Sequence, residues 1–147
     1  MPTAEQNNTV ERWFGELFTR GDLDAVDDLV ALNMVVHGQG GAEDSQGREA
    51  FRGWLRWYTS AFTEREWIVH DIVCEGEKIV VRYSGWATYR GGLLGIPSED
   101  QRVLETGILI LVVRDGLVQE LWSEMSDLQL VMQLGVLSQP GQGEEQY

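Results

Sequence analysis

The chain has 147 residues, and its 24 acidic residues against 11 Lys and Arg give a formal net charge of −13. So negative a protein repels phosphate backbones and anionic lipid headgroups, which argues against nucleic acid and membrane surfaces as partners. Hydrophobic residues make up 43% of the chain and include six tryptophans, enough apolar surface to fold around one core. We therefore expect a single domain with one core.

The cysteine and histidine content limits both the compartment and the cofactors. Cys74 is the only cysteine, so an internal disulfide and a multi-cysteine metal site are excluded. His37 and His70 lie far apart in the sequence, without the spacing of a histidine metal motif. The first residues lack the basic and apolar regions of a signal peptide. We expect a cytoplasmic protein without a metal or an organic cofactor.

The first half of the chain is predicted to be helical. Apolar residues recur at helical spacing over 9–19, 23–30 and 51–62, with Asn8 or Thr9 and then Asp22 available as N-caps. A short strand over 34–37 and a Gly-rich loop over 37–46 separate the second and third helices. Three helices are therefore expected before the main sheet.

The second half is predicted to be mainly strands, over 67–74, 79–89, 102–114 and 117–125. Gly76-Glu77 and Asp115-Gly116 are typical of tight hairpin turns. A last helix should begin at Asp127 with Ser126 as its cap, before a disordered tail over 138–147. This order predicts one α+β domain over 1–137, a cone-shaped barrel with helices packed on a curved, mostly antiparallel sheet around a pocket.

A series of short motifs in this order resembles the SnoaL-like polyketide cyclases of the nuclear transport factor 2-like superfamily. The motifs are Trp13-Phe14, Arg20 to Ala25, Val36-His37-Gly38, Gly47-Arg48-Glu49, Gly95-Ile96-Pro97, Asp115-Gly116 and Glu120-Leu121-Trp122. The resemblance implies a homodimer or homotetramer whose apolar interior binds a polycyclic aromatic polyketide. It also implies ring closure by intramolecular aldol condensation without a cofactor.

One position departs from the family pattern. Where the cyclases carry an acid/base Asp after His-Trp, this chain reads Leu121-Trp122-Ser123, and a serine is no base near neutral pH unless something activates it. Relatives on the same scaffold act as hydroxylases on anthracycline-type substrates, with an electron-rich substrate or a reductase partner. Cyclisation and hydroxylation therefore both stay open, beside a non-catalytic protein that binds an apolar ligand.

Pairing across the Asp115-Gly116 turn assigns candidate residues to the last hairpin. A two-residue turn sets Ser123 opposite Ile108. The same face then carries Thr106, Leu121 and Met125. We predict that these three residues contact substrate together with Ile108, Phe14, Trp54 and Tyr58. Glu105 and Glu124 fall on the alternate face. If that face lines the cavity, one carboxylate could act as a general base; otherwise both lie at the rim of an oligomer interface.

Two histidines complete the candidates. A tight turn at Gly76-Glu77 pairs His70 with Tyr83 in an apolar wall, either as a proton-exchanging pair or as a buried pair that satisfies itself. The same register predicts an ion pair between Asp71 and Arg82 on the other face. His37 stands beside the Gly-rich loop, where it could serve at a pocket mouth or simply cap a turn.

Overall fold

A computed structural model describes residues 1–136 of the chain. Six strands form one curved sheet in the order β2-β1-β6-β5-β4-β3, and all neighbours are antiparallel except β1 and β6, which are parallel. The strands are β1 (Val30–Val36), β2 (Ser45–Gln46), β3 (Phe62–Glu75), β4 (Lys78–Tyr89), β5 (Arg102–Arg114) and β6 (Leu117–Met125). The sheet bends strongly but does not close, so the predicted α+β class is confirmed with an open cone.

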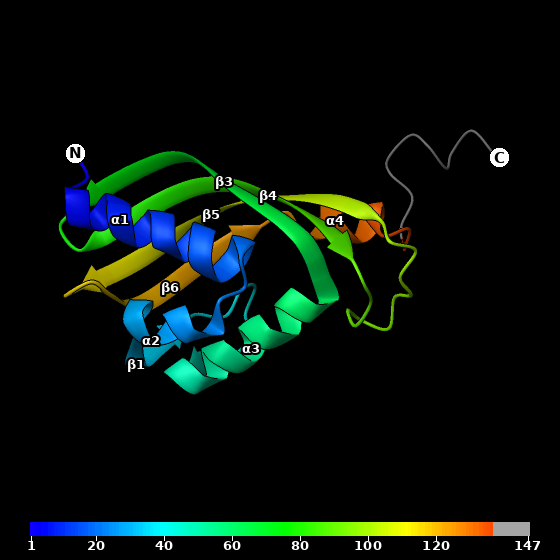
Figure 1. Ribbon diagram of the computed structural model, residues 1–147, viewed down its shortest axis with the longest axis horizontal. Helices are drawn as coiled ribbons and strands as arrows, with labels where there is room; N and C mark the ends of the chain where they lie inside the picture. Colours follow the sequence, from blue (N-terminus) through cyan, green and yellow to red (C-terminus); the bar gives the residue numbers. More distant parts are fainter. Residues whose placement is uncertain (137–147) are drawn as a thin grey trace.

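The helices cover the concave side of the sheet. They are α1 (Ala4–Arg12), the π-helical turn η1 (Trp13–Thr19), the 3₁₀ turn η2 (Leu23–Ala25), α2 (Val26–Leu29), α3 (Arg48–Ala61) and α4 (Asp127–Gln133). The long strands β3 and β4 arch over α1, while α3 lies along the open side and α4 at one end (Figure 1).

Local signals explain where most helices begin. The first helix starts at Ala4, earlier than predicted, because Thr3 and Gln6 form a capping box. The predicted cap Asp22 is confirmed, since its side chain accepts a hydrogen bond from the backbone N–H of Asp24. Ser126 was expected to cap α4 but makes no such bond; its hydroxyl accepts from the backbone N–H of Thr106 instead.

The hairpins form as the turn signals predict. Asp115 and Gly116 both have positive φ, 55° and 74°, as a type I′ turn requires, and strands β5 and β6 have the expected bounds. Strands β1 and β3 begin earlier than predicted, at Val30 and Phe62. The tail predicted to be disordered, 138–147, lies outside the described residues.

Two β-bulges shift the register and correct the predicted pairings. On β6 the register shifts between the pairs Val112–Glu120 and Val113–Val118, so Ser123 lies opposite Leu109 and not Ile108. On β3 the shift falls between Val69 and Asp71, so Tyr83 lies opposite Val69 and His70 has no cross-strand partner in the ladder. Beyond the bulge the predicted Asp71–Arg82 ion pair is present, at 2.6 Å.

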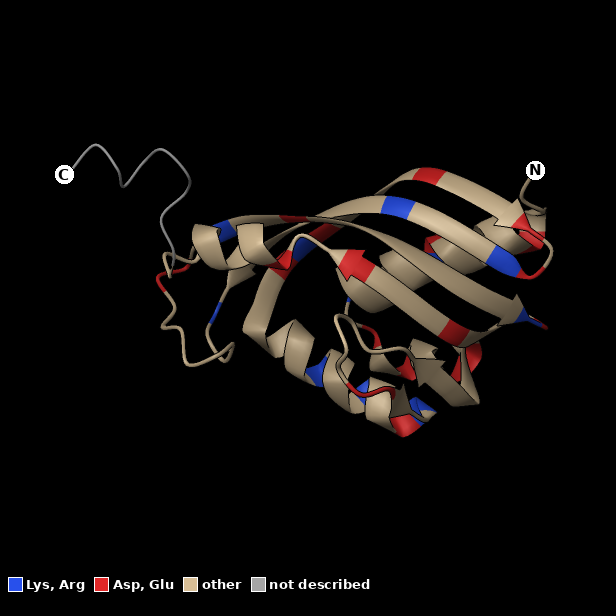
Figure 2. Ribbon diagram, turned by 180° about the vertical axis from the view of Figure 1, so that it is seen from behind, with Lys and Arg blue, Asp and Glu red and all other residues tan. Residues whose placement is uncertain are grey.

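Charge is spread over the surface. Seen from behind, Lys and Arg lie singly among Asp and Glu on the strands and helices (Figure 2). Several form ion pairs, such as Arg114 with Glu77 at 2.8 Å. Within residues 1–136, no helix is long and apolar enough to cross a bilayer.

Candidate active site

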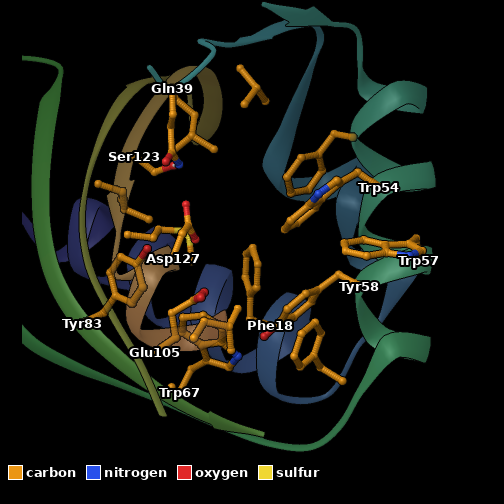
Figure 3. A pocket seen from close by; sticks show the side chains of 18 of the residues that line it. Phe18, Gln39, Trp54, Trp57, Tyr58, Trp67, Tyr83, Glu105, Ser123 and Asp127 are labelled. Carbon is orange, nitrogen blue, oxygen red and sulfur yellow. The ribbon is translucent and has the colours of Figure 1, made fainter. Parts of the chain in front are cut away.

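A cavity of about 390 Å³ lies between the concave face of the sheet and the helices (Figure 3). Its helical wall is aromatic and includes Phe14, Phe18, Phe51, Trp54, Trp57 and Tyr58. Its opposite wall, formed by strands β4 to β6 and the start of α4, includes Tyr83, Glu105, Leu121, Ser123, Met125 and Asp127. One wall therefore offers ring faces and the other offers most of the polar groups.

The aromatic wall is suited to a flat ligand. Trp54 and Tyr58 are four residues apart on α3, and their rings stack with centroids 5.4 Å apart and an interplanar angle of 6°. Tyr58 is buried, whereas Trp54 is 45% exposed and lies at the mouth. Stacked rings of this kind bind planar apolar groups. The predicted substrate contacts Phe14, Trp54 and Tyr58 all line the cavity.

Two glycines let aromatic side chains lie directly on the strands of the sheet. A Cβ at Gly85 on β4 would sit 2.7 Å from the ring of Trp67, and a Cβ at Gly107 on β5 would sit 2.5 Å from Oη of Tyr83. Glycine is therefore required at both positions if the rings are to keep their places. Gly85 is the cross-strand partner of Glu105, so the Trp67 ring packs beside the carboxyl group.

Glu105 is the most unusual polar group in the cavity. Its Oε2 is buried and has no hydrogen-bond partner within the described part of the chain. Burial, and then the charge of Asp127, raises its pKa from 4.5 to about 7. Because Gly107 pairs with Met125, continuing the register brings residues 105 and 127 opposite each other where the hairpin ends. Asp127 is exposed overall, but partial desolvation and then the charge of Glu124 raise its pKa as well.

Two phenols share the cavity with Glu105. Burial, and secondly the negative charge of Glu105, raises the pKa of both Tyr58 and Tyr83 above the usual value. Both therefore stay protonated at neutral pH and can donate a hydrogen bond. A carboxyl group that titrates near pH 7 and neutral phenols thus face one apolar space.

Ser123 and Gln39 supply a second polar position on the sheet wall. Ser123 faces the cavity from β6, and Gln39 reaches it from the loop after β1, donating from Nε2 to the serine Oγ at 2.9 Å. Figure 3 shows the pair at one end of the polar wall, away from Glu105. Ser123 pairs with Leu109, four residues along β5 from Glu105, so about 13 Å of strand separates the two positions.

His37 lies at the rim of the cavity and is engaged on both ring nitrogens. Nε2 lies 3.1 Å from Glu120 and Nδ1 lies 3.3 Å from Asp44, while the ring stacks on Trp122 with centroids 4.3 Å apart. These contacts join the loop after β1 to β6. The position fits a structural residue that holds the loop in place. This is the second of the two alternatives that the sequence left open for His37.

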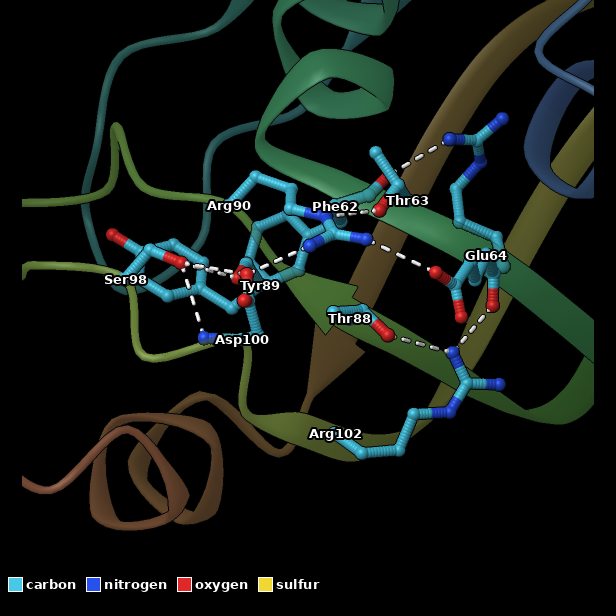
Figure 4. Close-up of polar contacts among 10 residues, drawn as sticks. Phe62, Thr63, Glu64, Thr88, Tyr89, Arg90, Ser98, Asp100 and Arg102 are labelled. Atoms are coloured by element: carbon cyan, nitrogen blue, oxygen red, sulfur yellow. Dashed lines mark hydrogen bonds and ion pairs between the residues drawn. The ribbon is translucent and has the colours of Figure 1, made fainter.

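The loop after β4 borders the cavity through Leu93 and is held at both ends (Figure 4). Buried Tyr89 donates from Oη to the carbonyl of Ile96 at 2.6 Å and accepts from the backbone N–H of Leu93 at 3.0 Å. Arg90 bridges Glu64 and Asp100, at 3.0 and 2.7 Å. These bonds fix the mouth of the cavity beside α3.

Several predicted site residues lie outside the cavity because of the bulges. His70 is on the outer face, exposed, and bonds to Ser84 at 2.7 Å, so the predicted His70–Tyr83 pair does not form. Thr106 and Ile108 are also on the outer face and exposed, whereas Leu121 and Met125 line the cavity as predicted. Glu105 and Glu124 lie on opposite faces; the former is in the cavity and the latter is exposed.

Sequence reasoning missed Asp127 and Gln39 as site residues. The sequence pattern marks Asp127 only as the first residue of a helix, although its position after β6 brings it opposite Glu105. Gln39 lies in a Gly-rich loop whose path no periodicity predicts. Among the described residues, no group of three or more His, Cys, Asp or Glu side chains is arranged to hold a metal ion.

Comparison with known proteins agrees with the fold. The family model described as SnoaL-like polyketide cyclase matches residues 8–134. The chain therefore belongs to the SnoaL-like polyketide cyclase family. A search of curated proteins finds no significant match.

Solved structures of similar fold come from several Streptomyces proteins. TsrD from Streptomyces laurentii is 28% identical, with a TM-score of 0.82 over 93% of this chain and 99% of that one. IdmH from Streptomyces antibioticus, a candidate polyketide cyclase, is 25% identical, with a TM-score of 0.75 over 91% and 100%. AclR from Streptomyces galilaeus, a candidate hydroxylase, is 22% identical, with a TM-score of 0.76 over 97% and 86%.

Proposed function

We propose that this protein closes a ring in a polycyclic aromatic polyketide by intramolecular aldol condensation, with Glu105 as the general base. The observation that carries the proposal is the buried, unpartnered Oε2 of Glu105 in an apolar cavity. A carboxyl group with a pKa of about 7 is ionised in a large fraction of molecules at neutral pH and is still a strong enough base to accept an α-proton.

The proposed reaction balances without a cofactor. The Glu105 carboxylate removes a proton from the carbon next to a substrate carbonyl, and the resulting enolate carbon attacks a second carbonyl of the same molecule. One carbon–carbon bond forms, and the second carbonyl becomes an alkoxide. The proton held by Glu105 returns to that alkoxide, directly or through the hydroxyl of Tyr83. The phenols of Tyr58 and Tyr83 supply hydrogen bonds to the developing negative charge.

In this proposal the base lies on β5, the strand that pairs with β6, whereas the family pattern has it on β6. Ser123 occupies the position where the family pattern has an Asp, and its hydroxyl is no base on its own. Glu105 is about 13 Å away along the strand, so the reacting carbon would lie at the other end of the cavity. The closed ring would then differ from that made by a cyclase with the Asp.

The test is turnover of an aromatic polyketide ester with an uncyclised side chain. We expect purified protein to accelerate ring closure, Glu105→Gln to abolish the acceleration, and Glu105→Asp to keep part of it. The double variant Glu105→Gln with Ser123→Asp asks whether a carboxylate at the family position restores closure. Unaccelerated closure by the wild type, or full activity of Glu105→Gln, would contradict the proposal.

Ser123 supports a second candidate, a hydroxylase, because the family Asp is absent there. That reaction inserts one oxygen atom from O₂ and needs two electrons, from an electron-rich substrate or a reductase. Incubation under ¹⁸O₂ with a reductase supplied separates the two candidates. Label in the product supports hydroxylation, and its absence together with ring closure supports the cyclase. Tight binding with neither product would point to a ligand carrier.

A further inference from the structure

The end of the cavity at Ser123 is neutral and already has a fixed hydrogen-bond geometry. Gln39 donates from Nε2 to Oγ of Ser123 at 2.9 Å, so the serine acts as the acceptor in that bond. A hydroxyl carries one proton of its own and can accept and donate at once. The Ser123 proton therefore remains to be donated, and the side chain lies on the cavity wall (Figure 3).

The loop that carries Gln39 is built to hold this side chain in place. Asp44 accepts a hydrogen bond from the backbone N–H of Gly38 at 3.0 Å and lies 3.3 Å from His37. The carbonyl of Gln39 accepts from the N–H of Ala42 at 3.0 Å. A Cβ at position 38 would sit 2.0 Å from the carbonyl oxygen of Ala42, so only glycine permits this tight path.

The charge of the cavity restricts which group this end can take. The described lining residues include the carboxyl groups of Glu105 and Asp127 but no Lys or Arg. The imidazole of His37 at the rim is already bonded to Asp44 and Glu120, so an anionic ligand group would meet repulsion and lose its hydration without gaining a free cation. An uncharged oxygen suits a serine hydroxyl donor, because a carbonyl or hydroxyl accepts that proton at little desolvation cost.

We propose that Ser123 and Gln39 form a second substrate subsite, which binds an uncharged carbonyl or hydroxyl oxygen at the end of the substrate remote from the reacting carbon. Gln39 is a positioning residue, because it fixes the serine so that its proton is directed to the ligand. The subsite and Glu105 are about 13 Å apart along β5, so together they select an elongated multi-ring substrate and set which carbon meets the base. This inference extends the proposed function and rests on it for the identity of the base.

Binding of matched anthracenes tests the subsite without turnover. Acetylanthracene, ethylanthracene and anthracene carboxylate, substituted at the same carbon, have the same rings and differ in one small group. Quenching of tryptophan fluorescence reports binding, because Trp54 and Trp57 line the cavity. We expect the wild type to bind the acetyl compound about fivefold more tightly than the ethyl compound, as one neutral hydrogen bond implies. The carboxylate should bind most weakly.

The variants separate a positioning role from a structural one. Ser123→Ala should remove the preference for acetyl over ethyl, while Ser123→Thr, which keeps the hydroxyl, should retain it. Gln39→Glu keeps the length of the side chain but replaces the donor by an acceptor, so the serine proton turns to the new carboxylate and the preference should also be lost. If Gln39 only anchored the loop, Gln39→Glu would keep the preference, and the proposal would be wrong.

Glu105→Gln makes the two proposals distinguishable. It should keep the acetyl preference while losing ring closure. An active Glu105→Gln variant would overturn the assignment of the base and leave the subsite standing. An unchanged preference in Ser123→Ala overturns the subsite, whatever happens to turnover. Thermal melting of every variant checks that it is folded.

Discussion

The two ends of the polar wall differ in whether their polar side chains are hydrogen-bonded. At the Ser123 end, the hydroxyl is bonded to Gln39 and the loop behind it is pinned by His37 and Asp44. At the Glu105 end, a buried carboxylate oxygen has no partner within residues 1–136. Buried polar groups are normally paired, and in this cavity wall only Trp13 Nε1, Trp67 Nε1 and Glu105 Oε2 are not, within residues 1–136. An indole N–H exchanges no proton near neutral pH, so the carboxyl group marks the place where chemistry is expected. The paired end is suited to recognition.

The largest effect should separate the two ends by kinetics. Glu105→Gln keeps the shape of the side chain but removes the base, so kcat should fall by about a hundredfold to ten-thousandfold. Ser123→Ala should mainly raise KM, by about fivefold, because it removes one neutral hydrogen bond. Steady-state kinetics of both variants on the same substrate measure the difference. Equal losses of kcat in the two variants would show that the ends are not functionally distinct.

The pH dependence of the free energy of unfolding should reveal the cost of burying an ionised Glu105. The folded-state pKa of about 7 lies above the usual 4.5, so the folded protein binds this proton more tightly than the unfolded chain does. The contribution of Glu105 to the free energy of unfolding is fully present below pH 4.5. It is lost as the pH rises to about 7, a loss of about 3 kcal/mol. Relative to wild type, Glu105→Gln should therefore gain stability from pH 4.5 to pH 8. Urea unfolding of both proteins checks this, and parallel curves would contradict the raised pKa.

The next largest effect is an expected loss of stability from overpacking at the Glu105 end of the cavity. Gly85→Ala forces a methyl group against the Trp67 ring beside Glu105 and should cost about 1–3 kcal/mol. Gly53→Ala is a suitable control, because Gly53 lies inside α3 with nothing within 4 Å of its Cβ position. That change should stabilise the protein by about 0.5–1 kcal/mol. Thermal unfolding compares the two, and a neutral Gly85→Ala would mean that Trp67 does not rest on the strand.

The smallest expected effect lies on the aromatic wall shared by both ends. Trp54→Ala removes the half-exposed ring that stacks on Tyr58 at the mouth and should weaken binding of the anthracene probes by about fivefold. Trp54→Phe keeps a ring face and should lose less. Titration followed through the remaining tryptophans gives both constants. Unchanged affinity in Trp54→Ala would place the ligand deeper, away from α3.

The elements of the fold were predictable because their signals are local. Apolar spacing predicts α3, and Asp115-Gly116 predicts the last hairpin with the strand ends found in the structure. The site was less predictable because one extra residue inverts a face. The bulge near Gln119 on β6 places Ser123 opposite Leu109, so Ile108 falls on the outer face. The bulge at His70 separates that histidine from Tyr83. No sequence pattern here predicts a bulge in strands that are apolar on both faces.

The register shift in the last hairpin also determines which carboxyl group faces the cavity. Glu105 and Glu124 were expected on one face, but the shifted register sends Glu105 inward and leaves Glu124 exposed. Asp127 entered the site because the strand ends just before it and the chain turns over the cavity. Gln39 depends on a loop path set by Gly38 and Asp44. These are contacts between distant residues, which a reading of local patterns does not contain.

The most direct test of Glu105 as the base is the pH dependence of kcat/KM for ring closure. The free enzyme needs the ionised carboxylate, so kcat/KM should rise as the pH increases through about 7 and then level off. In Glu105→Gln, kcat/KM should be much lower and should not rise with pH. A wild-type profile that is flat from about pH 5 to 9, or one whose rise persists in Glu105→Gln, would show that another group removes the proton.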